Sequence, residues 1–466
     1  MPIAGNAGGC CADAGAGVPF CDRRAKGGRV TAKEGGGDAL VQRHYRRNAA
    51  AFVGEATLFG IGLLFASTTT VLPGFVSELS GSAVLVGLVI SLSEGAWRLP
   101  QLLLANWIGP KPRKKRYLTG VGMVVRPVYL AYAVALVLGV WRYPVLALTV
   151  FFVLHTLMYA GLGVDTLVWW DVLAKTVPER RRGRVLGAST VLRGLIAVAG
   201  GALISLLLSE SGPGFPTGYT VSLAVAGGFF MLSLASWLLV VEPAETSTAP
   251  RPPWRAYFRD VAEVLRSDGA LRRLLWVRVL AGASGFALGF YILFGIDVLG
   301  LPREMIGVFA AVQTVGGILS GILFGWLSER CGNHRVIQIA TAVSLGSPAV
   351  ALLFTMWPQA LWGPLYALVF AAIGAAQNAN FIGFANLNVE LAPQGKRTTY
   401  IGLFNTLSGL VVIWPAIGGW VLERTSYVFL FAATLLALSA AHALSWWLSS
   451  GRTRAPGSVA GLPPLP

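Results

Sequence analysis

Twelve apolar segments, each about 20 residues long, dominate this chain of 466 residues. A helix of that length crosses the hydrocarbon core of a bilayer, and a backbone inside a bilayer must satisfy its hydrogen bonds within its own segment. An all-α integral membrane protein with twelve transmembrane helices is therefore predicted. The predicted spans are 50–72, 83–107, 117–140, 144–173, 185–209, 219–241, 274–297, 304–327, 335–356, 360–391, 399–421 and 427–449.

The composition and the position of charges support a membrane protein. Hydrophobic residues make up 55% and charged residues 12% of the chain, and the mean hydropathy is +0.65. The net charge of +16 resides largely in alternate loops, which fits the positive-inside rule, so no nucleic-acid partner is expected. The basic loops are Lys111–Arg116, Arg180–Arg184, 251–278, Arg330–Arg335 and Lys396–Arg397. The loops without Lys or Arg are Pro73–Ser82, Ser209–Gly218 and Met356–Gln359. Both termini are thus predicted to be cytoplasmic, in a multi-pass protein of the cell membrane.

Five regions are predicted along the chain. Residues 1–49 are expected to form a disordered cytoplasmic tail or an upstream extension beyond the biological start. Helical bundles are expected at 50–241 and 274–449, and a second tail at 450–466. The connection at 242–273 carries an amphipathic helix, which fits either the inner leaflet or the cytoplasmic ends of the bundles.

Two pairs of similar stretches indicate that the chain consists of two related halves. Gly325–Arg335 and Ala105–Arg116 each lie between two apolar segments and share a tryptophan and a final arginine at equal separation. Gly187 and Gly194 match Gly402 and Gly409 at a similar offset. Two independent matches of this kind are typical of a transporter with internal repeats.

The Gly325–Arg335 stretch closely resembles the loop between the second and third helices of each half in the major facilitator superfamily of transporters. The matching residues are Gly325, Leu327, Glu329, Arg330 and Gly332, with Arg335 as a further basic position. The resemblance implies two pseudo-symmetric six-helix bundles around a midplane cavity. It also implies a cytoplasmic gate in which Glu329 and Arg330 clamp neighbouring helix ends. Gly109 and Pro110 replace the acidic position in the first-half copy, so no equal clamp is expected there.

No enzyme, metal or cofactor signature is present. The chain has no Walker A loop, no Gly-x-Ser-x-Gly motif and no paired histidines at metal-binding spacing. Cys10, Cys11, Cys21 and Cys331 fit no standard zinc pattern and are expected to be reduced thiols. No cofactor or metal is therefore predicted.

Charges inside the spans are the most informative residues, because each one costs about 2.5–3.5 kcal/mol at the bilayer centre. Glu94, Arg98 and Gln101 share one face of the second span near the midplane. Glu94 is the first candidate for a carboxylate that binds and releases a proton during transport. A permanent ion pair between packed helices is the alternative, and it is favoured for Arg98.

Arg126, Arg193 and Glu55 are further charges within a few turns of the cytoplasmic face. Snorkelling to the interface would account for all three charges and is favoured for Glu55. Arg126 is also a candidate for the substrate cavity or for coupling. Asp165 is a poorer coupling candidate than Glu94 because it lies closer to the cytoplasm. Asp171 is expected to pair with the basic loop at 180–184.

Polar and aromatic stripes supply the other candidates. Gln377, Asn380, Phe384 and Asn388 share one face of the tenth span, which favours a cavity lining, with interhelical amide bonding as the alternative. Phe290, at four-residue spacing from Phe286 and Phe294, fits either packing or contact with an apolar substrate. His155 fits either a proton relay or a structural hydrogen bond.

The sequence thus predicts a secondary active transporter of an unidentified small solute, working by alternating access as a monomer in the lipid bilayer. Proton coupling is expected, and transport in the efflux direction is compatible with it. The alternatives are an uncoupled facilitator of the same fold and a transport-inactive membrane sensor or scaffold.

Overall fold

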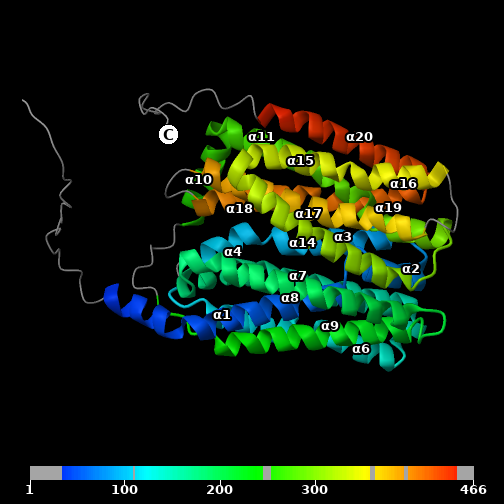
Figure 1. The fold of residues 1–466 in the computed structure, drawn as a ribbon, viewed down its shortest axis with the longest axis horizontal. Helices are drawn as coiled ribbons and strands as arrows, with labels where there is room; N and C mark the ends of the chain where they lie inside the picture. The colour runs from blue at the N-terminus through cyan, green and yellow to red at the C-terminus, as the bar shows by residue number, and fades with distance from the viewer. Residues whose placement is uncertain (1–33, 109–110, 245–252, 357–362, 393–396, 449–466) are drawn as a thin grey trace, which may run out of the picture.

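The computed structural model describes residues 34–108, 111–244, 253–356, 363–392 and 397–448, which form an elongated bundle of helices (Figure 1). Twelve of the helical stretches in these ranges are long and apolar enough to cross a membrane. The prediction of twelve spans is confirmed.

The first half contains α1 (Glu34–Phe65), α2 (Val71–Ser80), α3 (Ala83–Arg98), α4 (Gln101–Ile108), α5 (Lys115–Val125), α6 (Val128–Val137), α7 (Pro144–Thr176), α8 (Glu179–Leu208) and α9 (Thr217–Ser236). The connection carries α10 (Trp254–Ser267). The second half contains α11 (Gly269–Ala281), α12 (Gly285–Leu288), α13 (Phe290–Leu293), α14 (Met305–Cys331), α15 (Asn333–Ser344), α16 (Gly346–Met356), α17 (Gly363–Leu391), α18 (Arg397–Ser408), α19 (Trp414–Leu422) and α20 (Tyr427–Ser445).

Several spans consist of two helices because proline interrupts the backbone ladder. Pro100 separates α3 from α4, and Pro127 separates α5 from α6. Proline has no backbone N–H, so it cannot continue the pattern of helical hydrogen bonds. Arg98 and Arg126 each stand directly beside such a break in the helical hydrogen bonds.

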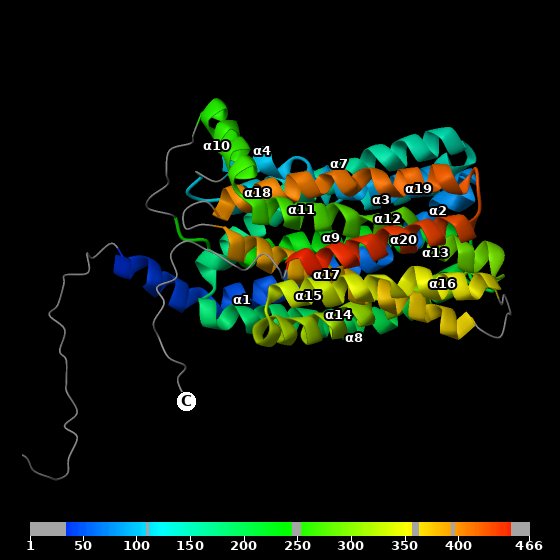
Figure 2. The same cartoon turned by 90° about the horizontal axis from the view of Figure 1, so that it is seen from above.

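The two halves meet along two pairs of helices. The fifth span, α8, packs against the eighth, α14, and the second span, α3, packs against the eleventh at α19. Exchanging the two halves converts one of these pairs into the other, as expected for a chain of two related six-helix units. The start of α1, the end of α20 and all of α10 lie at the same end of the bundle (Figures 1 and 2).

Two sequence predictions at the ends of the bundle are wrong. Helix α1 begins at Glu34, so the later part of the stretch predicted to be a disordered tail is helical. The Pro73–Ser82 stretch, predicted to be an outer loop, lies mostly in α2, where Leu72, Phe75 and Val76 have 0% exposure. Apolar residues at helical spacing continue beyond Phe65, and burial of that stripe against α3 explains the second helix.

The amphipathic helix α10 packs on the end of the bundle. Val261 and Val264 are buried in a cluster with residues of both halves, and the Tyr257 hydroxyl donates to the Leu102 carbonyl at 3.3 Å. Trp254 and Phe258 remain exposed with their rings stacked at 5.9 Å. The helix thus packs on the bundle ends, one of its two predicted environments, and contact of its exposed rings with the inner leaflet stays a prediction.

Candidate functional site

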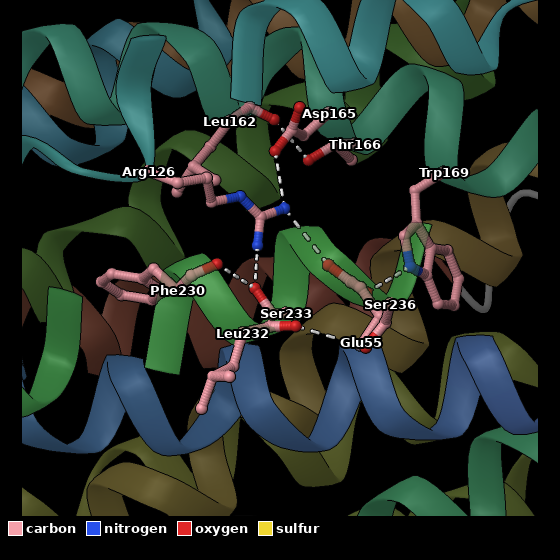
Figure 3. Close-up of polar contacts among 10 residues, drawn as sticks. All are labelled: Glu55, Arg126, Leu162, Asp165, Thr166, Trp169, Phe230, Leu232, Ser233 and Ser236. Atoms are coloured by element: carbon pink, nitrogen blue, oxygen red, sulfur yellow. Dashed lines mark hydrogen bonds and ion pairs between the residues drawn. The ribbon is translucent and has the colours of Figure 1, made fainter. Parts of the chain in front are cut away.

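A buried cluster of three charges lies inside the first half (Figure 3). Arg126 is only 2% exposed, and its guanidinium bridges two carboxylates. Its Nη2 lies 3.2 Å from Oε1 of Glu55 and 2.8 Å from Oδ2 of Asp165, while its Nη1 donates to the Ser233 hydroxyl. We call Glu55, Arg126 and Asp165 the charge cluster. It joins α1, α5, α7 and α9, four elements of one half.

The prediction that Glu55 snorkels to the interface is wrong. Glu55 is 5% exposed and Asp165 is 5% exposed, so both carboxylates are enclosed by protein. Trp169 Nε1 donates to the other Glu55 oxygen at 2.8 Å, and the Arg126 guanidinium lies 4.5 Å from the Phe59 ring. Tertiary packing therefore satisfies these charges in place of water.

The charge cluster is not electrically balanced. Two ionised carboxylates around one guanidinium carry a net charge of −1, and one bound proton brings the net charge to zero. An uncompensated charge inside a membrane protein is costly, so the proton-bound and proton-free forms impose different demands on the surroundings.

The two carboxylates differ in their hydrogen bonding. Both oxygens of Glu55 accept hydrogen bonds, which stabilise its ionised form. Oδ2 of Asp165 accepts a hydrogen bond from Arg126, while its Oδ1 has no hydrogen-bond partner among the described residues. Asp165 is therefore the better proton acceptor of the pair.

Glu94 and Arg98 form a second ion pair, on one face of α3. Arg98 Nη2 lies 2.6 Å from Oε2 of Glu94, and the side chains are 15% and 38% exposed, respectively. The arginine also lies over the Trp97 ring at 4.9 Å. Gln101 is 1% exposed; its amide donates to the Trp97 carbonyl across the Pro100 break and its oxygen accepts from Asn405. Gln101 thus connects the two halves.

Trp97 connects the ion pair to the charge cluster. Its Nε1 donates to the Thr166 hydroxyl at 2.9 Å, and Thr166 follows Asp165 directly in α7. A chain of contacts therefore runs from Arg98 through Trp97 to the residue beside Asp165. Sequence reasoning missed Thr166, Trp169 and Ser233. Trp169 could have been found from its position four residues after Asp165, on the same helical face.

His155 has a structural arrangement. It is 0% exposed, its Nδ1 lies 2.7 Å from the Tyr129 hydroxyl, and its Nε2 lies 2.9 Å from the Ser93 hydroxyl and 3.0 Å from the Val89 carbonyl. Both ring nitrogens are occupied by groups of the first half, so the histidine ties α7 to α3 and α6.

The polar side chains of the tenth span do not all contact the same neighbouring element. Asn380 donates to Ser344 in α15 at 3.0 Å, Asn388 donates to the Tyr400 carbonyl at 3.4 Å, and Phe384 is 2% exposed. These contacts correspond to interhelical bonding. Gln377 is exposed and accepts from Gln313, which in turn accepts from Thr69 of the first half at 2.9 Å.

Phe290 has 0% exposure and is packed in the core.

The loop motif lies where α14 ends. Gly332 has a φ of 81°, which terminates the helix, and Arg330 lies over Trp326 at 4.4 Å. Glu329 and Arg335 are exposed, Gly325 is partly exposed, and Glu329 makes no ion pair with a described residue. In the first-half copy, Gly109 and Pro110 lie outside the described residues.

Asp171 was predicted to pair with the loop at 180–184, and this is wrong. Its carboxylate lies 2.9 Å from Lys114 Nζ and 2.7 Å from Lys175 Nζ. Lys175 follows Asp171 by one helical turn, and α5 packs beside α7, which brings Lys114 to the same carboxylate. Within the described residues, no group of three His, Cys, Asp or Glu side chains could hold a metal ion.

Twelve membrane-spanning helices in two related halves, with charged residues set inside the spans, define the architecture of a secondary transporter. Residues 124–414 and 296–463 match the family model described as Major Facilitator Superfamily. The chain belongs to this superfamily, as its loop motif indicated.

Solved structures with the same fold include transporters with different cargoes. The nucleoside transporter NupG has a TM-score of 0.67 and 12% identity, covering 85% of this chain and 99% of its own. The D-xylose-proton symporter has a TM-score of 0.64 and 14% identity, with coverage of 86% and 97%. An inward-facing bacterial homologue of the iron transporter ferroportin has a TM-score of 0.61 and 15% identity, with coverage of 87% and 99%. These identities support the fold alone. No curated protein sequence matches the chain.

Proposed function

We propose that this protein is a secondary active transporter that couples movement of a small solute to movement of protons by alternating access. The charge cluster is the observation that carries the proposal. It places two carboxylates on one guanidinium within the membrane, so binding one proton changes the net charge of a buried site. This role goes to Asp165 rather than to Glu94, because Asp165 is buried and has an oxygen without a partner among the described residues.

The contacts between the halves support an alternating-access cycle. Towards one end, which we assign to the outside, backbones of the two halves touch: Gly87 faces Pro415, and Gly307 faces Gly201. Farther along α8 and α14, Cβ atoms at Gly187 and Gly325 would meet no other element of the described chain within 4 Å. The close contacts at the outer end support a cycle in which this end opens and closes.

Two polar tethers reinforce the outer contacts. Glu78 of the first half pairs with Arg303 of the second at 2.8 Å, and Glu423 accepts hydrogen bonds from the Ser82 hydroxyl and the Val84 N–H. The hydrogen bond from Ser82 lowers the pKa of Glu423, so this tether is present at neutral pH and weakens as the pH falls through that pKa. Burial raises the pKa of Glu78, although Arg303 opposes this shift.

Proton coupling can be tested before the solute is known. Purified protein is placed in liposomes containing a pH-sensitive dye, and candidate solutes are added on one side. We expect the correct solute to drive a proton flux, and an imposed pH gradient to drive its accumulation. Solute movement without either effect would support an uncoupled facilitator, and lack of any solute movement across a broad panel would support a sensor or scaffold.

The proposed orientation places both termini and α10 in the cytoplasm of the cell that contains this membrane. Single cysteines at Ser211 and Thr425 are expected to react with an impermeant reagent added outside intact cells. Cysteines at Arg113 and Arg184 are expected to react only after permeabilisation. All four side chains are exposed, so accessibility to the reagent depends on sidedness. Labelling of Arg113→Cys in intact cells would reverse the orientation.

A further inference from the structure

Arg278 is a membrane arginine that the sequence analysis did not single out. It lies in α11, the first part of the seventh span, and is partly buried. Its guanidinium lies 5.4 Å from the ring centroid of Phe384 on α17. No described acidic side chain is in ion-pair contact with it. Arg126, by contrast, contacts two carboxylates.

Arg278 belongs to a group that includes side chains of the other half. The eleventh span connects it to α3: a Cβ at Gly282, one turn beyond Arg278, would meet Val411, and a Cβ at Gly95, next to Glu94, would meet Val412. Glu94 is already paired with Arg98 at 2.6 Å. With all three residues ionised, the group carries a net charge of +1. We call Glu94, Arg98 and Arg278 the arginine group.

Both guanidiniums have a geometry suited to recognising an anion. Arg98 lies over Trp97, and Arg278 lies over Phe384, so each planar group is supported on one face by an aromatic ring. A supported guanidinium presents its N–H donors in a fixed fork that matches a carboxylate or a phosphate. An anion between them would find charge complementarity on both sides.

The position of the group between the halves gives it a link to the transport cycle. Arg98 comes from the first half, and Arg278 and Phe384 come from the second. A ligand held by both arginines would bind differently in conformations that change their separation, and only such differential binding can shift a conformational equilibrium. The packing of Gly409 against Leu99 and the Cβ of Arg98 keeps the eleventh span beside the same site.

We propose that the arginine group is the binding site for the anionic head, carboxylate or phosphate, of a small soluble substrate. The proposal rests on the transporter function proposed above and adds the substrate class. Glu94 serves as the internal counter-ion of Arg98, and an incoming anion competes with it for the guanidinium. Glu94 therefore weakens anion binding, whereas the two arginines strengthen it.

Equilibrium binding to the purified protein tests this proposal without any proton gradient. The probes are succinate and glycerol 3-phosphate, added at constant ionic strength, with D-xylose as a neutral probe and tetramethylammonium as a cation. We expect saturable binding of at least one anion, measured by calorimetry and by thermal stabilisation. We expect no binding of D-xylose or tetramethylammonium. Arg98→Gln and Arg278→Gln should each weaken that binding by about tenfold or more, because each removes a charge-assisted contact.

A third variant is expected to change the affinity for the anion in the opposite direction, which separates recognition from structural support. Glu94→Gln should tighten anion binding, since it raises the charge of the group from +1 to +2. Arg424→Gln removes an exposed arginine over Trp420 and should leave binding unchanged. If Arg98→Gln does not fold, the Glu94→Gln/Arg98→Gln double variant removes the pair without stranding a carboxylate, and it should still bind more weakly than Glu94→Gln alone.

Three results would overturn the proposal. One is the absence of saturable anion binding in the wild type. A second is equal affinity in the wild type and both arginine variants. The third is a response to lysophosphatidylglycerol but not to glycerol 3-phosphate, which would assign the group to a lipid headgroup. Anion binding combined with a lack of proton flux would leave this site intact and remove only the proposed coupling.

Discussion

Replacing Asp165 with asparagine is expected to abolish solute accumulation driven by a pH gradient while preserving solute exchange. Asparagine has nearly the same shape but cannot ionise, so the charge cluster keeps the net charge of its proton-bound form. With one proton per solute, a gradient of one pH unit supports at most about tenfold accumulation, and the variant should lose all of it. The measurement is labelled-solute uptake into liposomes, with and without the gradient.

Glu94→Gln is the matched control, because it also neutralises one membrane carboxylate that is paired with an arginine. We expect this variant to retain accumulation driven by the pH gradient and to change only the affinity for the solute. The reverse result, with coupling lost in Glu94→Gln and kept in Asp165→Asn, would assign the proton to Glu94. Loss of exchange as well as accumulation in Asp165→Asn would instead assign Asp165 to structure.

The connection between the two sites gives the coupling a physical basis. Asp165 contacts Arg126, and the adjacent Thr166 accepts a hydrogen bond from Trp97, which supports Arg98. A change of charge at Asp165 therefore acts on a helix that also contacts the proposed anion site. Trp97→Phe removes the N–H donor of this chain and keeps a smaller aromatic ring beside Arg98, so it tests whether solute binding and proton binding affect each other.

The sequence was sufficient to predict the spans but not the partners of the charges. Each span follows from a local run of apolar residues, and the Glu94–Arg98 pair follows from a four-residue spacing on one helix. Arg126, in contrast, is 71 positions from Glu55 and 39 positions from Asp165. Their contact depends on how α1, α5 and α7 pack, which no local pattern reveals.

The tenth span shows a second limit of sequence analysis. Gln377, Asn380 and Asn388 are spaced along one helix, but α17 is surrounded by α14, α15, α16 and α18. Asn380 therefore meets α15, whereas Gln377 meets α14. Spacing indicates which residues lie near one another on a helix, and neighbouring helices determine what each of them contacts.

Enlarging Gly307 or Gly87 to valine is expected to shift the protein towards an outward-open conformation. A Cβ at Gly307 would lie within 3 Å of Gly201 and Ser205, and one at Gly87 would lie within 3 Å of the Pro415 backbone. These contacts join the two halves at the outer end, so the added atoms oppose closure there. Overpacking of this kind costs about 1–3 kcal/mol, equivalent to a population change of roughly 5- to 150-fold.

Distances between spin labels measure this shift directly. Labels at Ser211 and Thr425 report on the outer ends of the two halves, and labels at Arg184 and Arg335 report on the inner ends. In both glycine variants we expect the outer pair to move apart and the inner pair to move closer. Gly374→Val is a matched control, because its Cβ would meet the Gln313 backbone within the second half and should lower stability without changing either distance distribution. A Cβ at Gly228 would have no neighbouring element within 4 Å, so Gly228→Val should also leave both distance distributions unchanged. Unchanged outer distances in both Gly307→Val and Gly87→Val would show that these glycines fix helix packing without controlling access, because the halves would then close despite the added side chains.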